Sequence, residues 1–181
     1  MTKKRQKQKN TRDLVLGIFV IGLVVVVGAA LFTSYTNQGG TSGVAETLNI
    51  TTLAGETLNI PDEDKKATVV FAMAYWCGTC IPEARALARL KAEMGDQLQI
   101  VIVDIDPSSN AELVQQFQLA VGNNANTLHW VLDKEGVISR TYELRVLDTT
   151  IIFNNQAQET YRDAYPTDYN TLHAQLEALG L

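Results

Sequence analysis

The chain has 181 residues, of which 46% are apolar and 19% charged, and it contains two cysteines and two histidines. This composition excludes global disorder and a disulfide-dense scaffold, and the spacing of cysteines and histidines shows no structural zinc site. Residues 1–13 carry six basic groups and one acidic group, a net charge of +5; the remaining residues hold 9 basic and 19 acidic groups, a net charge of −10. That acidic remainder would repel phosphates, so no nucleic-acid partner is expected.

Residues 14–32 read LVLGIFVIGLVVVVGAALF, without a charged side chain. At ~1.5 Å of rise per residue, a helix of this length spans ~28 Å, about the thickness of a bilayer core. Basic residues precede the run, and the next charge is Glu46. The positive-inside rule then predicts a single-pass helix in the inner (cytoplasmic) membrane, with residues 1–13 as a cytoplasmic tail and the C-terminal part extracytoplasmic.

A cleaved signal peptide is the competing interpretation, with Gly28, Ala29 and Ala30 as the small residues before the cleavage point. The apolar run exceeds the usual length of such a segment, which favours an uncleaved anchor. A buried core helix is disfavoured because the run has no polar face. Residues 33–43 are polar and rich in Gly, Ser and Thr, which predicts a flexible linker, and we expect the folded domain over residues 44–181.

Within that domain, the pattern of apolar residues changes between the periods of strands and helices. Ser109 and Glu112 match a capping box at the start of a helix. Residues 137–144 are ambiguous between helix and strand. The expected elements are a hairpin over 46–50 and 56–60, strands at 68–74, 98–105, 129–132 and 149–153, a returning strand at 157–162, and helices at 81–94, 109–120 and 168–179. The β–α–β start implies a parallel pair with a right-handed crossover, and the late hairpin adds antiparallel strands. The fold class is therefore α/β, with a mixed sheet and helices on its faces.

Both cysteines lie in the segment Trp76-Cys77-Gly78-Thr79-Cys80, between a predicted buried strand and a predicted helix. Unpaired N–H groups and the dipole at a helix N-terminus stabilise a thiolate, which lowers its pKa and makes it a nucleophile at neutral pH. The spacing lets Cys80 resolve a mixed disulfide formed on Cys77. The segment therefore predicts dithiol–disulfide exchange, with Cys77 attacking and Cys80 resolving.

Three other interpretations of the pair remain open. A structural disulfide would close so short a loop that it removes little entropy from the unfolded chain. Half of a metal site is a second interpretation, although neither histidine is near in sequence. Two inert buried cysteines are the third.

The segment AYWCGTCIPEARAL resembles the active site of thioredoxin-fold proteins, and the order of elements resembles the membrane-anchored thiol–disulfide oxidoreductases of the TlpA/ResA type. Residues 53–60 are similar to the hairpin motif of that family, and residues 132–154 to its D-x-x-G-x-V…P-T-T-F stretch. The resemblance covers residues 44–181 and implies a thioredoxin-like fold, a redox-active Cys77–Cys80 disulfide and no cofactor. We expect no metal ligands.

By the same resemblance, Glu83 is a glutamate that transfers protons at the active site. A carboxylate one turn beyond Cys80 could accept the proton of that thiol, directly or through water. An ordinary first-turn glutamate that complements the helix dipole is the equal alternative. Trp76 would offer a contact surface for substrate, or else be a partly buried aromatic residue.

Two departures from the pattern stand out. The acid that thioredoxin carries six residues before its first cysteine is replaced by Phe71. The cis-proline that faces the cysteines in the family is replaced by Asp148, which precedes Thr149, and we expect a trans peptide bond there. By resemblance, Asp148 and Thr149 lie in the loop that docks substrate, although a carboxylate near Cys77 would oppose thiolate formation.

The sequence thus predicts a membrane-anchored enzyme that exchanges disulfides of extracytoplasmic proteins, with the reducing direction favoured, for example toward apocytochrome c. A membrane-embedded redox partner would reset the cysteine pair. The alternative is a non-catalytic thioredoxin-fold accessory subunit of a membrane protein complex, favoured by Asp148 and Phe71. Copper delivery is weaker: residues 147–152 resemble a Sco-type segment, but Thr149 stands where that family has its histidine.

Overall fold

A computed structural model of the protein describes residues 43–181. The predicted tail, the predicted transmembrane helix and nearly all of the predicted linker lie outside these residues. Within residues 43–181, no helix is both long enough and apolar enough to cross a membrane.

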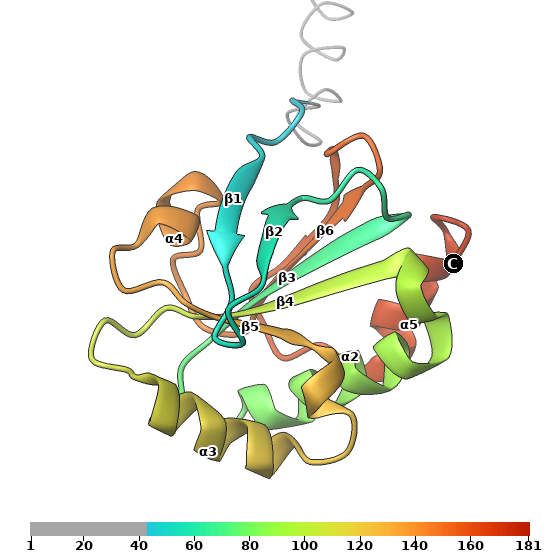
Figure 1. The fold of residues 1–181 in the computed structure, drawn as a ribbon. Coiled ribbons are helices and arrows are strands. Elements are labelled where there is room, and N and C mark those ends of the chain that lie inside the picture. The colour runs from blue at the N-terminus through green and yellow to red at the C-terminus, as the bar shows by residue number, and fades with distance from the viewer. Residues whose placement is uncertain (1–42) are drawn as a thin grey trace, which may run out of the picture. The chain divides into compact units, whose positions relative to one another are not determined.

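The described chain forms a two-stranded hairpin, β1–β2, and a mixed five-stranded sheet in the order β5-β4-β3-β6-β7 (Figure 1). β3 pairs in parallel with β4, β4 in parallel with β5, and β6 is antiparallel to both β3 and β7. The elements are β1 (Leu48–Thr51), β2 (Thr57–Ile60), β3 (Ala67–Met73), α2 (Cys80–Met94), η1 (Gly95–Gln97), β4 (Leu98–Asp104), α3 (Ala111–Val121), η2 (Ala125–Thr127), β5 (His129–Leu132), α4 (Val137–Thr141), β6 (Thr149–Asn154), β7 (Glu159–Asp163) and α5 (Tyr169–Glu177). The predicted thioredoxin-like α/β architecture is confirmed for the described residues.

The central strands β3 and β4 are buried along their whole length because both faces of the sheet are covered. Helices α2, α3 and α5 pack on one face, and the hairpin and α4 pack on the other (Figure 1). Alternate residues of β3 divide between the two cores: Phe71 faces the helices, and Val70 faces the hairpin. Because both faces of the sheet are covered, the C-terminal end of β3 is held in place, and the cysteine segment follows that end.

The expected strands, hairpins and three longer helices are present within one or two residues of their predicted bounds. The predicted cap of α3 is wrong: Asn110, not Ser109, accepts the N–H of Leu113 at 3.0 Å. The hydroxyl of Ser109 donates instead to the buried carboxylate of Asp104 at 2.6 Å. Asp104, the last residue of β4, therefore takes the hydroxyl of Ser109, and the serine does not cap α3.

The ambiguous segment 137–144 begins as the short helix α4. Asp133 decides this outcome, because its carboxylate accepts the N–H groups of Ile138 and Ser139 at 3.1 and 2.7 Å. These contacts satisfy N–H groups at the start of α4 that have no partner within the helix.

The two ends of β3 carry different parts of the chain. The cysteine segment follows Met73 at one end of the strand. At the other end, Ala67 pairs with Asn154, next to the turn whose Gln158 bridges Val44. The described chain therefore enters the fold at the end of β3 opposite the cysteines.

Candidate redox-active site

Cys77 and Cys80 form a disulfide at the N-terminus of α2, as the sequence predicts. The N–H of Cys77 donates to the carbonyl of Ala74 at 2.8 Å, which turns the chain sharply after β3. α2 begins at Cys80, which is fully buried, whereas Cys77 keeps 5% of its surface exposed. The more accessible of the two residues is thus the cysteine predicted to attack, and the fully buried one is the predicted resolving cysteine.

Asp148 lies beside this disulfide. Its carboxylate oxygen and the two sulfur atoms are all within 4.8 Å of one another. The hydroxyl of Thr79 donates to Asp148 Oδ2 at 2.8 Å and lies 3.3 Å from Cys77 Sγ. Asp148 Oδ1 is buried and has no hydrogen-bond partner. A buried acceptor without a partner is costly, so this oxygen is the unusual feature of the site.

The backbone at Asp148 differs from what a proline could adopt. Asp148 has a φ of 57°, and its N–H donates to the carbonyl of Ala72 in β3 at 3.0 Å. Proline fixes φ near −65° and has no N–H, so it could provide neither feature. The only cis peptide bond in residues 43–181 precedes Pro61, so the bond before Asp148 is trans, as expected.

Glu83 is buried, with only 1% of its surface exposed. Its carboxylate accepts hydrogen bonds from the hydroxyl of Thr150 in β6 and, at 2.8 Å, from the N–H of Thr167. Burial raises the pKa of Glu83 to about 7, although the two hydrogen bonds oppose that rise. Glu83 is therefore not an exposed first-turn glutamate. Near neutral pH its carboxyl group can take up or release a proton one helical turn from Cys80.

The other predicted site residues have contrasting environments. Trp76 is 61% exposed, and its indole N–H donates to Asp106 at 2.6 Å, so its ring is open to a partner beside Cys77. Thr149 is buried, and its hydroxyl donates to the carbonyl of Val146 within the loop. Phe71 lies in the core at the position of the missing acid. The structure thus brings Cys77, Cys80 and Asp148 together, with Trp76 at the rim.

Sequence reasoning missed three residues that hold these groups. Thr79 lies inside the motif, but only the folded chain shows that its hydroxyl joins Cys77 to Asp148. Thr150 and Thr167 fix the carboxylate of Glu83. Thr167 lies 84 residues after Glu83, and no local pattern marks it.

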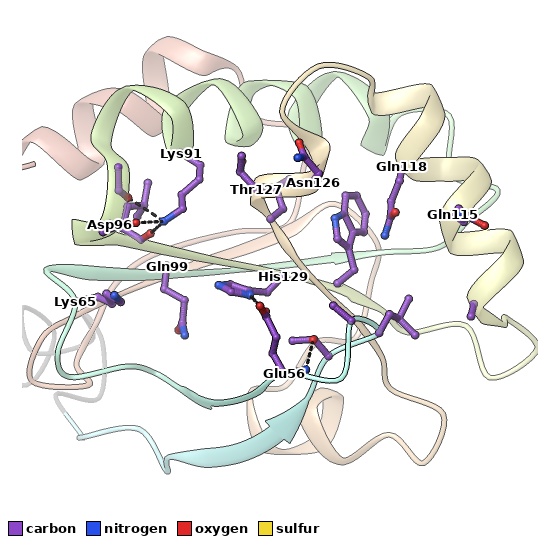
Figure 2. A pocket seen from close by; sticks show the side chains of 18 of the residues that line it. Glu56, Lys65, Lys91, Asp96, Gln99, Gln115, Gln118, Asn126, Thr127 and His129 are labelled. Carbon is purple, nitrogen blue, oxygen red and sulfur yellow. Dashed lines mark hydrogen bonds and ion pairs between the residues drawn. The ribbon is translucent and has the colours of Figure 1, made fainter.

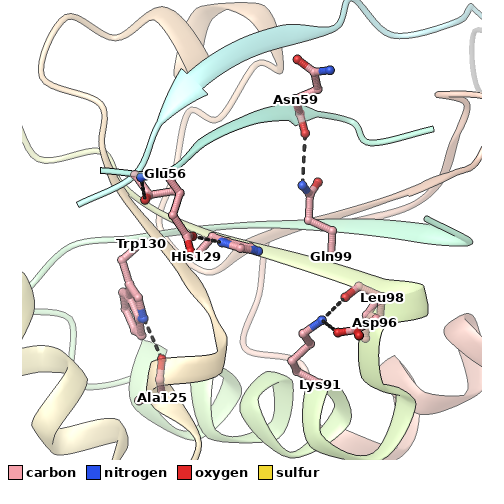
Figure 3. A network of polar contacts seen from close by, with 10 residues as sticks. Glu56, Asn59, Lys91, Asp96, Leu98, Gln99, Ala125, His129 and Trp130 are labelled. Atoms are coloured by element: carbon pink, nitrogen blue, oxygen red, sulfur yellow. Dashed lines mark hydrogen bonds and ion pairs between the residues drawn. The ribbon is translucent and has the colours of Figure 1, made fainter. Parts of the chain in front are cut away.

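A separate hollow of about 940 Å³ lies between the turn of the hairpin, the C-terminal part of α2 and α3 (Figure 2). At ~1.5 Å per residue, Lys91 on its wall is about 16 Å along α2 from Cys80. Glu56 contacts His129 at 3.2 Å, and Gln99 donates to the carbonyl of Asn59 at 3.2 Å (Figure 3). These pairs join the hairpin to the sheet, and none of the predicted site residues lines the hollow.

Comparison with known proteins agrees with this architecture. A family model described as Redoxin matches residues 38–176. "Mercury resistance operon ORF3" of Streptomyces lividans is 27% identical over 131 residues, which cover 71% of this chain and 67% of that protein. StoA from Bacillus subtilis has a TM-score of 0.62 at 22% identity, with 75% of this chain and 99% of that chain covered. A secreted disulfide oxidoreductase of Mycobacterium tuberculosis, described as homologous to Escherichia coli DsbE, has a TM-score of 0.60 at 20% identity, with 72% and 95% covered. The family match and the cysteine pair together support thiol–disulfide oxidoreductase activity.

Proposed function

Because the chain belongs to the Redoxin family, we propose that it is a membrane-anchored thiol–disulfide oxidoreductase that reduces disulfides of extracytoplasmic proteins. The observation that carries this proposal is the Cys77–Cys80 disulfide at the start of α2, in which the less buried cysteine follows an exposed tryptophan. An indole ring at the rim gives a protein substrate an apolar contact beside the reacting sulfur.

In the reducing direction, the thiolate of Cys77 attacks one sulfur of a substrate disulfide. A mixed disulfide forms, and one substrate thiolate leaves. Cys80 then attacks the sulfur of Cys77 after losing its proton, which Glu83 accepts directly or through water. The second substrate thiolate leaves as the Cys77–Cys80 disulfide forms. The two substrate thiols together have gained the two electrons that the cysteine pair has lost. A dithiol donor in the membrane returns two electrons and resets the pair.

The anchor and the location rest on the sequence. Residues 14–32 are apolar and long enough to span a bilayer core, and the basic residues precede them. The acidic residues that follow would then lie on the extracytoplasmic side, where disulfides persist. The name of the secreted mycobacterial relative is consistent with that side. A substrate with exported cysteine pairs, such as apocytochrome c, fits the same location.

A non-catalytic accessory subunit of a membrane complex is the second candidate, and Asp148 is the observation that favours it. A buried carboxylate within 4.8 Å of the sulfurs opposes the thiolate that exchange requires. In this function the domain would hold its complex together through surfaces that do not need the thiols.

An equilibrium redox titration of the full chain in glutathione buffers, followed by thiol alkylation and mass measurement, tests the enzyme. A reversible two-electron transition near the potential of thioredoxin, about −270 mV, is expected for a reductant, whereas one near about −120 mV would indicate an oxidant. If the cysteine pair shows no reversible transition, the proposed oxidoreductase activity is refuted. Cys77→Ser separates the two candidates in cells, because it removes all exchange but leaves an accessory subunit able to support its complex.

Labelling in intact cells tests the location. A membrane-impermeant maleimide should modify the reduced cysteine pair in whole cells as fully as in lysed cells, and a cytoplasmic thiol protein serves as the control. Protection of the pair until lysis would contradict the extracytoplasmic location.

A further inference from the structure

The exchange reaction described above does not use the carboxylate of Asp148. Asp148 is more than nine-tenths buried, and its Oδ1 atom has no hydrogen-bond partner. Thr79 holds the other oxygen at 2.8 Å, which fixes the carboxylate in place. A carboxylate that is held by one oxygen and leaves the other free has the arrangement of a monodentate metal ligand.

Among the described residues, one group of three potential ligands comes together, and it consists of Cys77, Cys80 and Asp148. We infer that the reduced protein binds a thiophilic divalent cation, Zn²⁺, through the two cysteine sulfurs and Asp148 Oδ1. The sequence predicted no metal ligands: the resemblance placed Asp148 near Cys77, but only the folded chain shows that one of its carboxylate oxygens has no partner.

The geometry requires little movement. Zn–S bonds of ~2.3 Å and Zn–O bonds of ~2.0 Å in a tetrahedron separate the ligand atoms by about 3.5–3.8 Å. The two sulfurs and one carboxylate oxygen of Asp148 already lie within 4.8 Å of one another. Reduction breaks the bond between the sulfurs and lets them move apart to that separation. Two thiols then bind one Zn²⁺ and release two protons, so no electron is transferred in the binding step.

The charges and the ligand types select the cation. Two thiolates and a carboxylate bring three negative charges into a mostly buried site, and a divalent cation offsets two of them. Thiolate sulfur favours Zn²⁺ over the hard cations Mg²⁺ and Ca²⁺, which prefer oxygen. Three protein ligands leave the fourth coordination position of Zn²⁺ open. Cys77 retains a small exposed surface, through which water or a thiol can reach that position. Bound Zn²⁺ would hold the pair in its reduced state and slow reoxidation.

The full chain, reduced with a phosphine and desalted without oxygen, is titrated with Zn²⁺ against a chromophoric chelator. We expect one Zn²⁺ per reduced chain and none at this site in the oxidised chain. Asp148→Asn should weaken binding by at least about tenfold, because the amide keeps the size and the contact with Thr79 but is a poorer ligand. Asparagine also tolerates the positive φ at this position, so the fold is retained. Circular dichroism of each variant checks the fold.

The matched control is Asp106→Asn, which removes the carboxylate that contacts Trp76. Asp106 is not in the ligand group and is partly exposed, so solvent screens its charge, and the affinity should change less than about twofold. Co²⁺ in place of Zn²⁺ should give visible bands of a tetrahedral thiolate site, which Asp148→Asn changes. Asp148→His, which restores a metal ligand, should recover tight binding. Equal affinity in Asp148→Asn and Asp106→Asn, or equal binding by reduced and oxidised chains, would overturn the inference. Because the readout is metal binding and not exchange, its failure leaves the proposed oxidoreductase untouched.

Discussion

Replacement of Glu83 by glutamine tests the most unusual acid of the site. Burial raises the pKa of Glu83 from 4.5 to about 7 in the folded protein. Between these pH values the folded chain keeps a proton on Glu83 that the unfolded chain has released. The free energy of unfolding that Glu83 contributes is therefore fully present below pH 4.5 and is lost as the pH rises to about 7. At about 1.36 kcal/mol per pH unit, the loss amounts to about 3 kcal/mol.

Glutamine does not titrate, so the free energy of unfolding of Glu83→Gln does not fall in this way between pH 4.5 and about 7. Its amide can still accept the N–H of Thr167 and donate to the hydroxyl of Thr150, which can turn to accept. The stability of the variant relative to the wild type should therefore rise by about 3 kcal/mol between pH 4.5 and 8.

Urea unfolding of the oxidised protein across this pH range measures the difference. Glu112→Gln is the matched control, because Glu112 is an exposed acid in the first turn of α3, and its effect should stay within about 0.5 kcal/mol. A difference between Glu83→Gln and the wild type that does not change with pH would refute the reasoning. The same variant should lose any inflection near pH 7 in the rate at which mixed disulfides are resolved.

Three further predictions concern single side chains. Cys80→Ser should trap a mixed disulfide with substrate, seen by mass spectrometry, whereas Cys77→Ser should trap none; a trapped species in both variants would exclude the assigned roles. Thr79→Val should lower the free energy of unfolding, measured with urea, by about 1–3 kcal/mol, because both oxygens of Asp148 are then without a protein donor. Thr79→Ser keeps the hydroxyl and should lower it much less. Equal losses in the two variants would mean that the hydroxyl is not the stabilising group. Asp133→Ala should lower the free energy of unfolding by about 2 kcal/mol, because it leaves the N–H groups of Ile138 and Ser139 unpaired. An unchanged unfolding midpoint would show that these hydrogen bonds do not stabilise α4.

The sequence predicted the fold well because its strong signals agree with one another. The apolar β-branched runs that became β3 and β4 are buried on both faces, and the residues between them have helical spacing. The weaker assignments depended on distant partners. Ser109 resembles a cap, yet Asp104 takes its hydroxyl and Asn110 becomes the cap. A local pattern cannot show which of two possible partners the fold brings closer.

The candidate site divides in the same way. The motif alone located Cys77 and Cys80, because their spacing and the strand–helix junction are local features. The environment of Glu83 was not predictable, since its burial arises from contacts with β6 and with the segment before α5. The placement of Asp148 beside the sulfurs required an alignment across some 70 residues, and its free oxygen appears only in the folded chain.

The bridge between Val44 and Gln158 has a consequence for how the domain is presented. It lies beyond one end of β3, and the cysteines follow the other end. The seven residues of β3, at ~3.3 Å of rise each, place its two ends about 20 Å apart. Val44, near the start of the described residues, therefore lies toward the end of β3 that is opposite the cysteine pair. In the proposed exchange reaction, a partner disulfide would approach Cys77 at the end of β3 that is away from Val44.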